Sequence, residues 1–325
     1  MQKLIDDLIF AVADVVLYRQ NKGLVKCHRG ASGLEPNLAN PQRYSDRMLW
    51  RKIVDHNPMF VIFADKLATK EFIRQVCPEL PLAKTLWVGK SSDEIPDELL
   101  KGDAYLKANH GCDFNYRIRG GRVNRTELRE TTRKWLATTY GQEGGEWAYS
   151  QVKPMLFVEV AIGDAEVDLI EVQIRASNGR EVQGSITVKD KTPARHMYYL
   201  DVEGNPAPHA EAPDGAPLET SPYGQAILPP YRKAIEYARR LSQRIDYARF
   251  DFMWNGKELY GGEITIYPAG GFREYGNAFG RELVLQGWDL SCSHFLTARH
   301  TGWKEIYAGA LRRRFTKPAA DTGQK

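Results

Sequence analysis

The hydrophobic positions of this chain recur with two different periods. Apolar residues three or four positions apart predict amphipathic helices, in the segments 42–56, 66–76, 125–140 and 229–245. Short runs rich in β-branched and aromatic residues predict strands, in the segments 83–89, 104–110, 155–162, 167–190, 247–254 and 258–267. Helices mixed with strands and hairpins predict an α+β protein. Two sheets that face each other across a cleft of nucleotide size would suit this order of elements.

Turn residues mark two hairpins within this pattern. Asn178-Gly179 joins two strand-like runs directly, which is a strong signal for a tight hairpin. Asn255-Gly256 separates two further strand-like runs in a similar way. The run 155–162 is apolar at nearly every position, which predicts a strand buried on both faces. The chain is therefore expected to contain local hairpins as well as a strand that lies inside a sheet.

The first 40 residues predict a helix and then a connection that Gly and Pro punctuate from His28 onward. Asp6, Asp7 and Asp14 interrupt the apolar stretch 4–18, which is too short and too charged to span a membrane. No basic start or small-residue cleavage site indicates a secretory signal. We expect an amphipathic helix docked on the body, with membrane-surface contact as the alternative.

The composition excludes some classes of protein but does not identify one. The chain has 325 residues, 42% of them hydrophobic, which is enough for a large packed core. Its net charge of +4 argues weakly for an anionic ligand and against a protein that coats nucleic acid. The four cysteines are scattered without a CxxC pair. This spacing disfavours a structural zinc site or a disulfide framework and fits a reducing cytoplasm.

The strongest chemical signal is a pair of acidic residues in the predicted hairpin. Asp251 lies in one strand and Glu263 in the next, each among apolar residues. A carboxylate in an apolar strand is costly to bury unless it is paired or binds a cation, and two on neighbouring strands suit Mg²⁺ held with substrate phosphates. A two-residue turn would not place them opposite each other, so a longer loop or a bulge at Gly261-Gly262 is needed. Two carboxylates on the solvent face of the hairpin are the alternative.

Two lysines stand at the ends of predicted elements. Lys66 opens a helix directly after Asp65, and Lys107 ends the strand in "YLKANHG". Taken singly, each is most simply a solvated charge, although either could meet a phosphate. Of the seven histidines, His110 is the one near this chemistry in the sequence. No convincing nucleophile accompanies it, which disfavours a triad hydrolase.

The order of these residues resembles the ATP-grasp superfamily, and more closely its TupA-like proteins, which are associated with teichuronopeptide and other cell-surface polysaccharide synthesis. The resemblance spans residues 40–290 and rests on "NPQRYSDRMLWRKIVDHNPMFVIFADKLATKEFI", "YLKANHG", "EWAYSQVKPMLFVEV", "RFDFMWNGKELYGGEITIYPAGGF" and "GWDL". It implies an ATP-grasp fold, in which two α+β subdomains with facing sheets grip ATP, and it implies ATP and Mg²⁺ as cofactors.

The resemblance also implies a division of the chain and a set of nucleotide contacts. The parts would be an N-terminal helix with its connection (1–40), a first part of the ATP-grasp unit (41–100), a lid subdomain (101–162), a C-terminal subdomain with the Mg²⁺ site (163–290) and a C-terminal helix with a tail (291–325). The implied nucleotide contacts are Lys66, Lys107, His110, Gly111, Glu159, Val160, Ile162 and Glu166, the last as one of two acids suited to the ribose.

The remaining implied roles concern the metal and the reaction. Asp251, Glu263 and Thr265 would hold Mg²⁺, with Thr265 where many ATP-grasp enzymes carry Asn. Arg273, Arg249 and Lys107 would act in catalysis, with Arg273 meeting the acyl phosphate or the substrate carboxylate. The implied enzyme is a cytoplasmic ligase that joins a small-molecule or glycan-linked carboxylate to an amine or amino acid through an acyl phosphate. A homodimer and peripheral membrane association are both left open.

Two departures from the family pattern keep other functions open. The loop after Lys107 carries Asp113 and Phe114 where the family has several glycines, and glycines let backbone N–H groups close over phosphates. Gln173 stands where the family usually has a lysine. A kinase-like phosphotransferase or a nucleotide-binding protein without turnover is therefore the alternative. A glycosyltransferase is less favoured, because the chain has no DxD pair.

Overall fold

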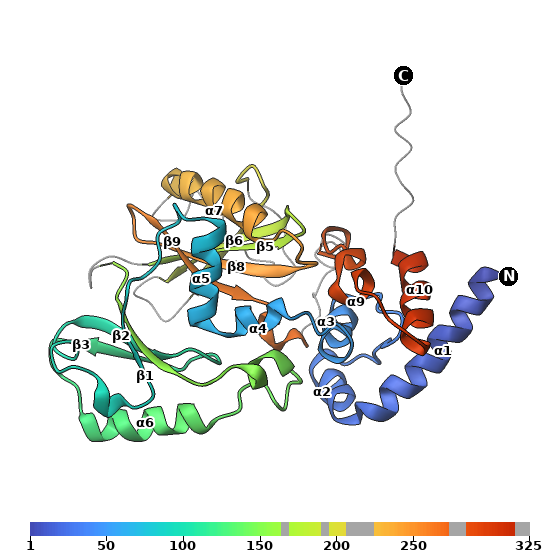
Figure 1. Ribbon diagram of the computed structural model, residues 1–325. Coiled ribbons are helices and arrows are strands. Elements are labelled where there is room, and N and C mark those ends of the chain that lie inside the picture. Colours follow the sequence, from blue (N-terminus) through green and yellow to red (C-terminus); the bar gives the residue numbers. More distant parts are fainter. Residues whose placement is uncertain (164–168, 190–194, 206–223, 273–283, 316–325) are drawn as a thin grey trace.

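Two antiparallel sheets face each other, and helices cover their outer sides (Figure 1). This computed structural model describes residues 1–325 except 164–168, 190–194, 206–223, 273–283 and 316–325. Among the described helices, none combines the length and the apolar character that crossing a bilayer requires. The segments predicted as strands form the two sheets, so the α+β prediction is confirmed.

Five helices lead into the first sheet. They are α1 (Gln2–Gln20), α2 (Lys22–Ser32), α3 (Tyr44–Ile53), α4 (Met59–Ala64) and α5 (Lys66–Val76). The Asp65 carboxylate caps α5 by accepting hydrogen bonds from the backbone N–H groups of Leu67 and Ala68, as expected for an Asp at a helix start. The connection expected from His28 is wrong in part, because α2 continues to Ser32 and ends only where Gly33 adopts φ 70°. The short helix α4 was not predicted.

The smaller sheet has the strand order β1-β4-β2-β3. Its strands are β1 (Thr85–Gly89), β2 (Asp103–Ala108), β3 (Asn115–Arg119) and β4 (Leu156–Val160). The central strand β4 is buried from Leu156 to Glu159, as its apolar run predicted. Helix α6 (Arg125–Ala137) covers this sheet and contributes Leu128 and Trp135 to its core. The short helices η1 (Ser92–Glu94) and η2 (Trp147–Gln151) lie in the connections.

The larger sheet has the strand order β7-β6-β5-β8-β9. Its strands are β5 (Ile170–Ser177), β6 (Arg180–Lys189), β7 (Arg195–Leu200), β8 (Ala248–Trp254) and β9 (Leu259–Thr265). The predicted turn between β5 and β6 is confirmed, since Asn178 and Gly179 both have positive φ angles, 45° and 81°. Helix α7 (Leu228–Leu241) packs on β5 and follows the short helix η4 (Gly224–Ile227). Strand β7 was not predicted.

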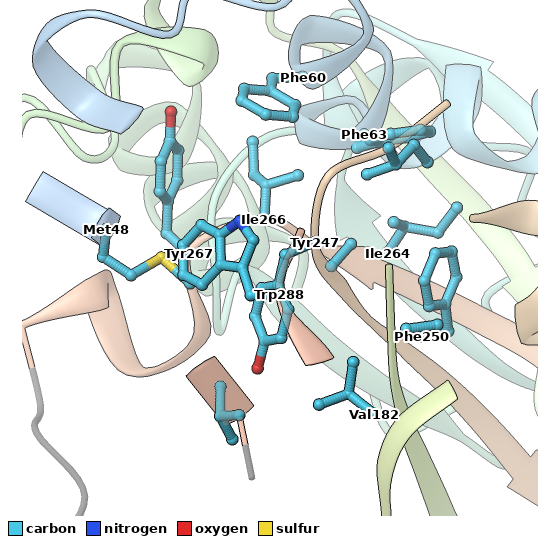
Figure 2. Packing of buried hydrophobic residues seen from close by; sticks show 14 of the residues in the cluster. Met48, Phe60, Phe63, Val182, Tyr247, Phe250, Ile264, Ile266, Tyr267 and Trp288 are labelled. Atoms are coloured by element: carbon cyan, nitrogen blue, oxygen red, sulfur yellow. The ribbon is translucent and has the colours of Figure 1, made fainter. Parts of the chain in front are cut away.

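A buried network joins the N-terminal helices to the larger sheet. Arg51 of α3 is fully buried, and its guanidinium donates to Asp246 at 2.8 Å and to the carbonyl of Ile266 at 2.8 Å. The indole N–H of Trp288 donates to the same Asp246 carboxylate. The Trp288 ring stacks on Tyr247 at 4.5 Å between ring centroids (Figure 2). Because Ile266 directly follows β9, this network fixes the end of that strand against α3.

The C-terminal part returns to the N-terminal helices. It contains η5 (Pro268–Gly271), η6 (Leu290–Cys292), α9 (His294–Thr297) and α10 (Trp303–Phe315). Helix α10 packs against α1, at the end of the molecule remote from the smaller sheet (Figure 1). The hydroxyl of Tyr307 on α10 accepts from the Trp50 indole and donates to the Ala39 carbonyl.

Candidate functional site

A cavity of about 150 Å³ lies between the two sheets. The smaller sheet contributes Lys107, Phe157 and Glu159, and helix α5 contributes Lys66 and Lys70. The larger sheet faces them with Glu171, Asp251, Met253, Gly261, Gly262 and Glu263. The cavity therefore has three lysines and one carboxylate, Glu159, on one side and three carboxylates on the other. That is the charge pattern expected of a site for a phosphate-bearing ligand and a metal ion.

The two carboxylates of the hairpin lie opposite each other because of a bulge. Asp251 pairs with Glu263, whereas the next pair is Phe252 with Gly261, so Gly262 is the extra residue on β9. A Cβ atom on Gly262 would lie 2.7 Å from the carbonyl oxygen of Asp251, which explains the glycine. The sequence called for a longer loop or a bulge at Gly261-Gly262, and the structure has both, since four residues separate the paired Trp254 and Leu259.

Arg249 covers the Asp251 carboxylate. Its Nε and Nη2 atoms donate to the two carboxylate oxygens at 2.7 Å each, and the Thr265 hydroxyl lies 3.2 Å from the second oxygen. Burial alone would lower the pKa of Arg249, but Asp251 holds it above the ordinary value. The pair is bidentate, which is the strong form of this interaction. Glu263 also lines the cavity, on the same side as Asp251.

Glu159 joins two lysines inside the cavity. Its carboxylate contacts Lys107 Nζ at 2.6 Å and forms a short ion pair with Lys70. Burial by itself raises the pKa of Glu159, but Lys107 and Lys70 together hold it below the ordinary value. Lys70 also donates to the Ala83 carbonyl at 2.8 Å, and burial lowers its pKa. Lys107 is thus no isolated surface charge.

Lys70 is a site residue that sequence reasoning missed. It follows Lys66 by four positions on α5, so both side chains lie on one face of the helix. That spacing was a usable signal, because the helix 66–76 itself was predicted. Its partner Glu159 lies 89 residues further along the chain, however, and that contact exists only in the folded protein.

Lys66 ties the start of α5 to the loop after β2. Its Nζ atom donates to the carbonyl of Gly111, and its backbone N–H donates to the carbonyl of Asn109 at 2.7 Å. Gly111 has φ 78°, and Asp113 has φ 60°, an uncommon value for a residue with a side chain. A Cβ atom on Gly111 would lie 2.8 Å from the Tyr140 ring. The loop therefore depends on this glycine.

His110 anchors the same loop to the end of α6. It is 1% exposed, and its Nε2 atom lies 3.2 Å from the carbonyl oxygens of Trp135 and Thr138 near the end of α6. Burial lowers the pKa of His110. The structure places the ring among protein groups, and it is not among the residues that line the cavity.

The strand end that follows Glu159 borders the cavity only in part. Ile162 lines it, whereas the backbone N–H of Val160 donates to the carbonyl of Lys84 at 2.9 Å. Two further predicted site residues, Glu166 and Arg273, lie outside the described residues.

The donors at this site fit Mg²⁺ that arrives with phosphate groups. Asp251, Glu263 and Thr265 offer hard oxygen atoms, which Mg²⁺ prefers. Within the described ranges, no group of three or more His, Cys, Asp or Glu side chains is arranged to hold a metal ion. A metal bound between Asp251 and Glu263 would therefore take its other ligands from phosphate oxygens or water, as Mg²⁺ commonly does at nucleotide sites.

Two facing sheets that enclose lysines and paired carboxylates are the arrangement of the ATP-grasp fold. The family model of TupA-like ATPgrasp proteins matches residues 46–283, and the chain belongs to this family. The family and fold expected from the sequence are thereby confirmed.

Solved structures to which this chain is similar include three ligases. The ATP-grasp ligase PsnB with its minimal precursor has 12% identity and a TM-score of 0.37, over 71% of this chain and 61% of that protein. D-alanine–D-alanine ligase from Bacillus anthracis with ATP has 16% identity and a TM-score of 0.34, over 63% and 55%. L-amino acid ligase from Bacillus licheniformis has 15% identity and a TM-score of 0.40, over 70% and 50%. This chain thus spans less than two thirds of each. No curated protein sequence matches it.

Proposed function

We propose that this protein is an ATP- and Mg²⁺-dependent ligase that joins a carboxylate to an amine with release of ADP. The observation that carries the proposal is the register of the β8–β9 hairpin, which sets Asp251 opposite Glu263 beneath the lysines of the facing side. Lys66 and Lys107 would bind phosphate oxygens of ATP from that side. Family membership supports the same assignment.

ATP would occupy the cavity between the sheets. Backbone groups of Glu159, Val160 and Ile162 are proposed to meet the adenine. The cavity of about 150 Å³ is smaller than ligand sites of roughly 300–1,000 Å³. Lys107 lines the cavity and is paired with Glu159. We expect the Lys107 side chain to move from Glu159 to the phosphates when ATP binds, which would enlarge the cavity. Lys70 would stay and neutralise Glu159, since it is the more buried of the two lysines.

The proposed reaction has two steps. An oxygen of the substrate carboxylate attacks the γ-phosphorus of ATP, the bond to the β–γ bridging oxygen breaks, and ADP leaves with that electron pair. The amine then attacks the acyl carbon, phosphate leaves, and the nitrogen loses a proton to form the amide. The chain need supply no covalent nucleophile, and its contribution is positioning and charge neutralisation. Mg²⁺ held by Asp251 and Glu263 would neutralise the negative charge of the phosphate oxygens.

Arg249 is proposed to contact the group that is transferred. Its guanidinium already binds the carboxylate of Asp251, which lies on the same strand and lines the cavity. A planar guanidinium can exchange the Asp251 oxygens for those of a phosphoryl or carboxylate group with the same bidentate geometry. Arg273 is proposed for the acyl phosphate or the substrate carboxylate.

The substrates are proposed as classes. The acid would be a small-molecule or glycan-linked carboxylate, and the nucleophile an amine or amino acid. Such substrates would suit an enzyme in the cytoplasm that takes part in the biosynthesis of cell-surface polysaccharide or a related natural product.

The test is ADP release from Mg-ATP with a panel of uronic acids, amino acids and hydroxy acids crossed with amines, with products identified by mass spectrometry. An amide with one ADP per product is expected. Glu263→Gln should lower the rate on the order of 100-fold or more, because an amide is a poor ligand for Mg²⁺. Glu258→Gln is the matched control, since Glu258 is exposed on the same hairpin. Full activity in Glu263→Gln would overturn the metal assignment.

The same assay separates the alternative functions. The loop with Asp113 at φ 60° favours them, because it lacks the extra glycines that close over phosphates. A phosphorylated acceptor with ADP would indicate a kinase-like enzyme. ATP binding without ADP release for any pair would contradict the ligase proposal and favour a nucleotide-binding role.

A further inference from the structure

The outer side of α1 is apolar along almost its whole length. Leu4, Leu8, Val12 and Val15 are 74%, 65%, 59% and 50% exposed. Their spacing of three or four positions places them on one stripe of the helix. The opposite side of α1 is also apolar, and it is buried against the body through Phe10, Ala13 and Leu17. A helix that is apolar on both sides is usually covered by other protein groups on both sides.

Helix α10 extends this apolar surface. Trp303 and Ile306 are 52% and 59% exposed. A groove of about 420 Å³ runs between the two helices. Its lining residues are Leu8, Ile9, Val12, Ala13, Val16, Trp303, Ile306 and Tyr307. We call the combined surface the α1–α10 face, and its exposed residues are Leu4, Ile5, Leu8, Val12, Val15, Val16, Trp303 and Ile306.

The α1–α10 face is held in place before anything binds it. Arg313 of α10 forms an ion pair with Asp6 of α1 at 2.6 Å. The Asp14 carboxylate of α1 accepts from the backbone N–H groups of Leu38 and Ala39 at 2.9 and 3.1 Å. These contacts fix both helices to the body, so a partner would meet a preformed surface and the cost of ordering it on binding would be small.

The size of the face matches that of a stable protein interface. From their exposed fractions of 38% to 74%, the eight side chains present on the order of 800 Å² of surface, about the area that each partner buries in a standard interface. Isolated apolar residues on a surface need no explanation, but a continuous patch of several hundred Å² marks an interaction site.

Charges of both signs border the α1–α10 face. Helix α1 has Asp6, Asp7 and Asp14 beside Lys3 and Arg19, whereas α10 has Glu305 beside Lys304, Arg312, Arg313 and Arg314. A neighbouring pocket of about 440 Å³ is lined by Asp7, Asp14 and Glu35. A helix that lies on a membrane is commonly rich in Lys and Arg beside its apolar stripe, whereas α1 has more acidic than basic side chains, and a border with both signs can pair opposite charges across a two-fold axis.

We propose that the α1–α10 face binds the same face of a second copy of this chain and forms a two-fold symmetric dimer. A two-fold interface pairs the same patch on both copies, and an apolar stripe bordered by charges of both signs suits such pairing. Because α1 and α10 lie at the end of the molecule remote from the smaller sheet (Figure 1), such a dimer leaves both cavities open. The dimer does not depend on the proposed ligase activity.

The test is the molar mass of the full-length protein in solution, measured by light scattering after size exclusion at micromolar concentration. The wild type is expected at twice the chain mass. Leu8→Glu and Val12→Glu each place two charges in an apolar interface and should raise the dissociation constant on the order of 100-fold or more. Val88→Glu is the matched control, because Val88 is 45% exposed on β1, away from the face. Circular dichroism melting checks that each variant folds.

Each outcome decides the proposal. A dimer that Leu8→Glu and Val12→Glu dissociate while Val88→Glu does not supports it. A dimer that survives both substitutions lies elsewhere on the surface and overturns it. A monomeric wild type also overturns it. In that case, sedimentation with phosphatidylglycerol vesicles that Leu8→Glu abolishes would assign the face to a membrane surface.

Discussion

Replacing Glu159 with Gln removes a buried carboxylate that Lys70 and Lys107 share. The Glu159 and Lys70 side chains are 7% and 9% exposed, so the variant leaves a buried ammonium without its counter-charge. Breaking such a pair costs about 3–5 kcal/mol. Lys70 retains the Ala83 carbonyl at 2.8 Å and the Thr85 hydroxyl at 3.2 Å. We therefore expect the free energy of unfolding to fall by the lower end of that range, about 3 kcal/mol.

The pH dependence of this loss follows from the lowered pKa of Glu159. A carboxylate whose pKa is lower in the folded state stabilises the fold above its ordinary pKa, near 4.3. That contribution is lost as the pH falls through the lowered value. The difference in stability between the wild type and Glu159→Gln should therefore be full near neutral pH and should vanish in acid.

Urea unfolding followed by tryptophan fluorescence at a series of pH values measures both effects. Glu79→Gln is the matched control, because Glu79 pairs with Arg240 at the surface, where an ion pair contributes little. A Glu159→Gln protein as stable as the wild type at neutral pH would refute the role of the buried bridge. A loss that persists unchanged in acid would show that charge is not its cause.

Two further predictions concern other buried features. Burial, with the nearby carboxylate of Asp246, raises the pKa of Asp55 to about 7. Asp55 therefore contributes most to the free energy of unfolding when the pH is below the ordinary Asp pKa, and this contribution is lost as the pH rises through about 7. Asp55→Asn should remove this part of the pH dependence in urea unfolding, and a profile parallel to the wild type would contradict the assignment. Gly262→Ala should cost about 1–3 kcal/mol and weaken stabilisation by Mg-ATP in thermal unfolding, because the added Cβ meets the Asp251 carbonyl. Gly102→Ala, where a Cβ meets nothing within 4 Å, is its control, and equal behaviour of the two variants would argue against the bulge.

Local signals in the sequence predicted most of the elements that build the site. The Asn178-Gly179 turn, the buried strand β4 and the cap at Asp65 all agree with the structure. Each depends on residues within a few positions of one another, where side-chain period and turn geometry restrict the backbone directly. The bulge at Gly262 was one of two predicted ways to bring Asp251 opposite Glu263, and the structure uses both, a four-residue loop between Trp254 and Leu259 and the bulge.

Features that depend on distant contacts were not predicted. Helix α4 (Met59–Ala64) is a short apolar run, and such a run does not distinguish a helix from a strand by its pattern. Strand β7 lies at the edge of the larger sheet and is recognisable by its pairing with β6. The role of Lys70 required the position of Glu159, and the apolar outer side of α1 required knowing which side the body covers.

The sequence by itself determined the α+β class, the hairpin with Asp251 and Glu263, and the resemblance to one family, because these follow from local period, turn chemistry and the order of motifs. Only the tertiary structure decided which charges meet. It sets Lys107 and Lys70 on Glu159, places Arg249 over Asp251, and leaves one side of α1 uncovered. The physical reason is that ion pairing and burial depend on distances between residues far apart in the chain, which only the packing of the two sheets and their helices determines.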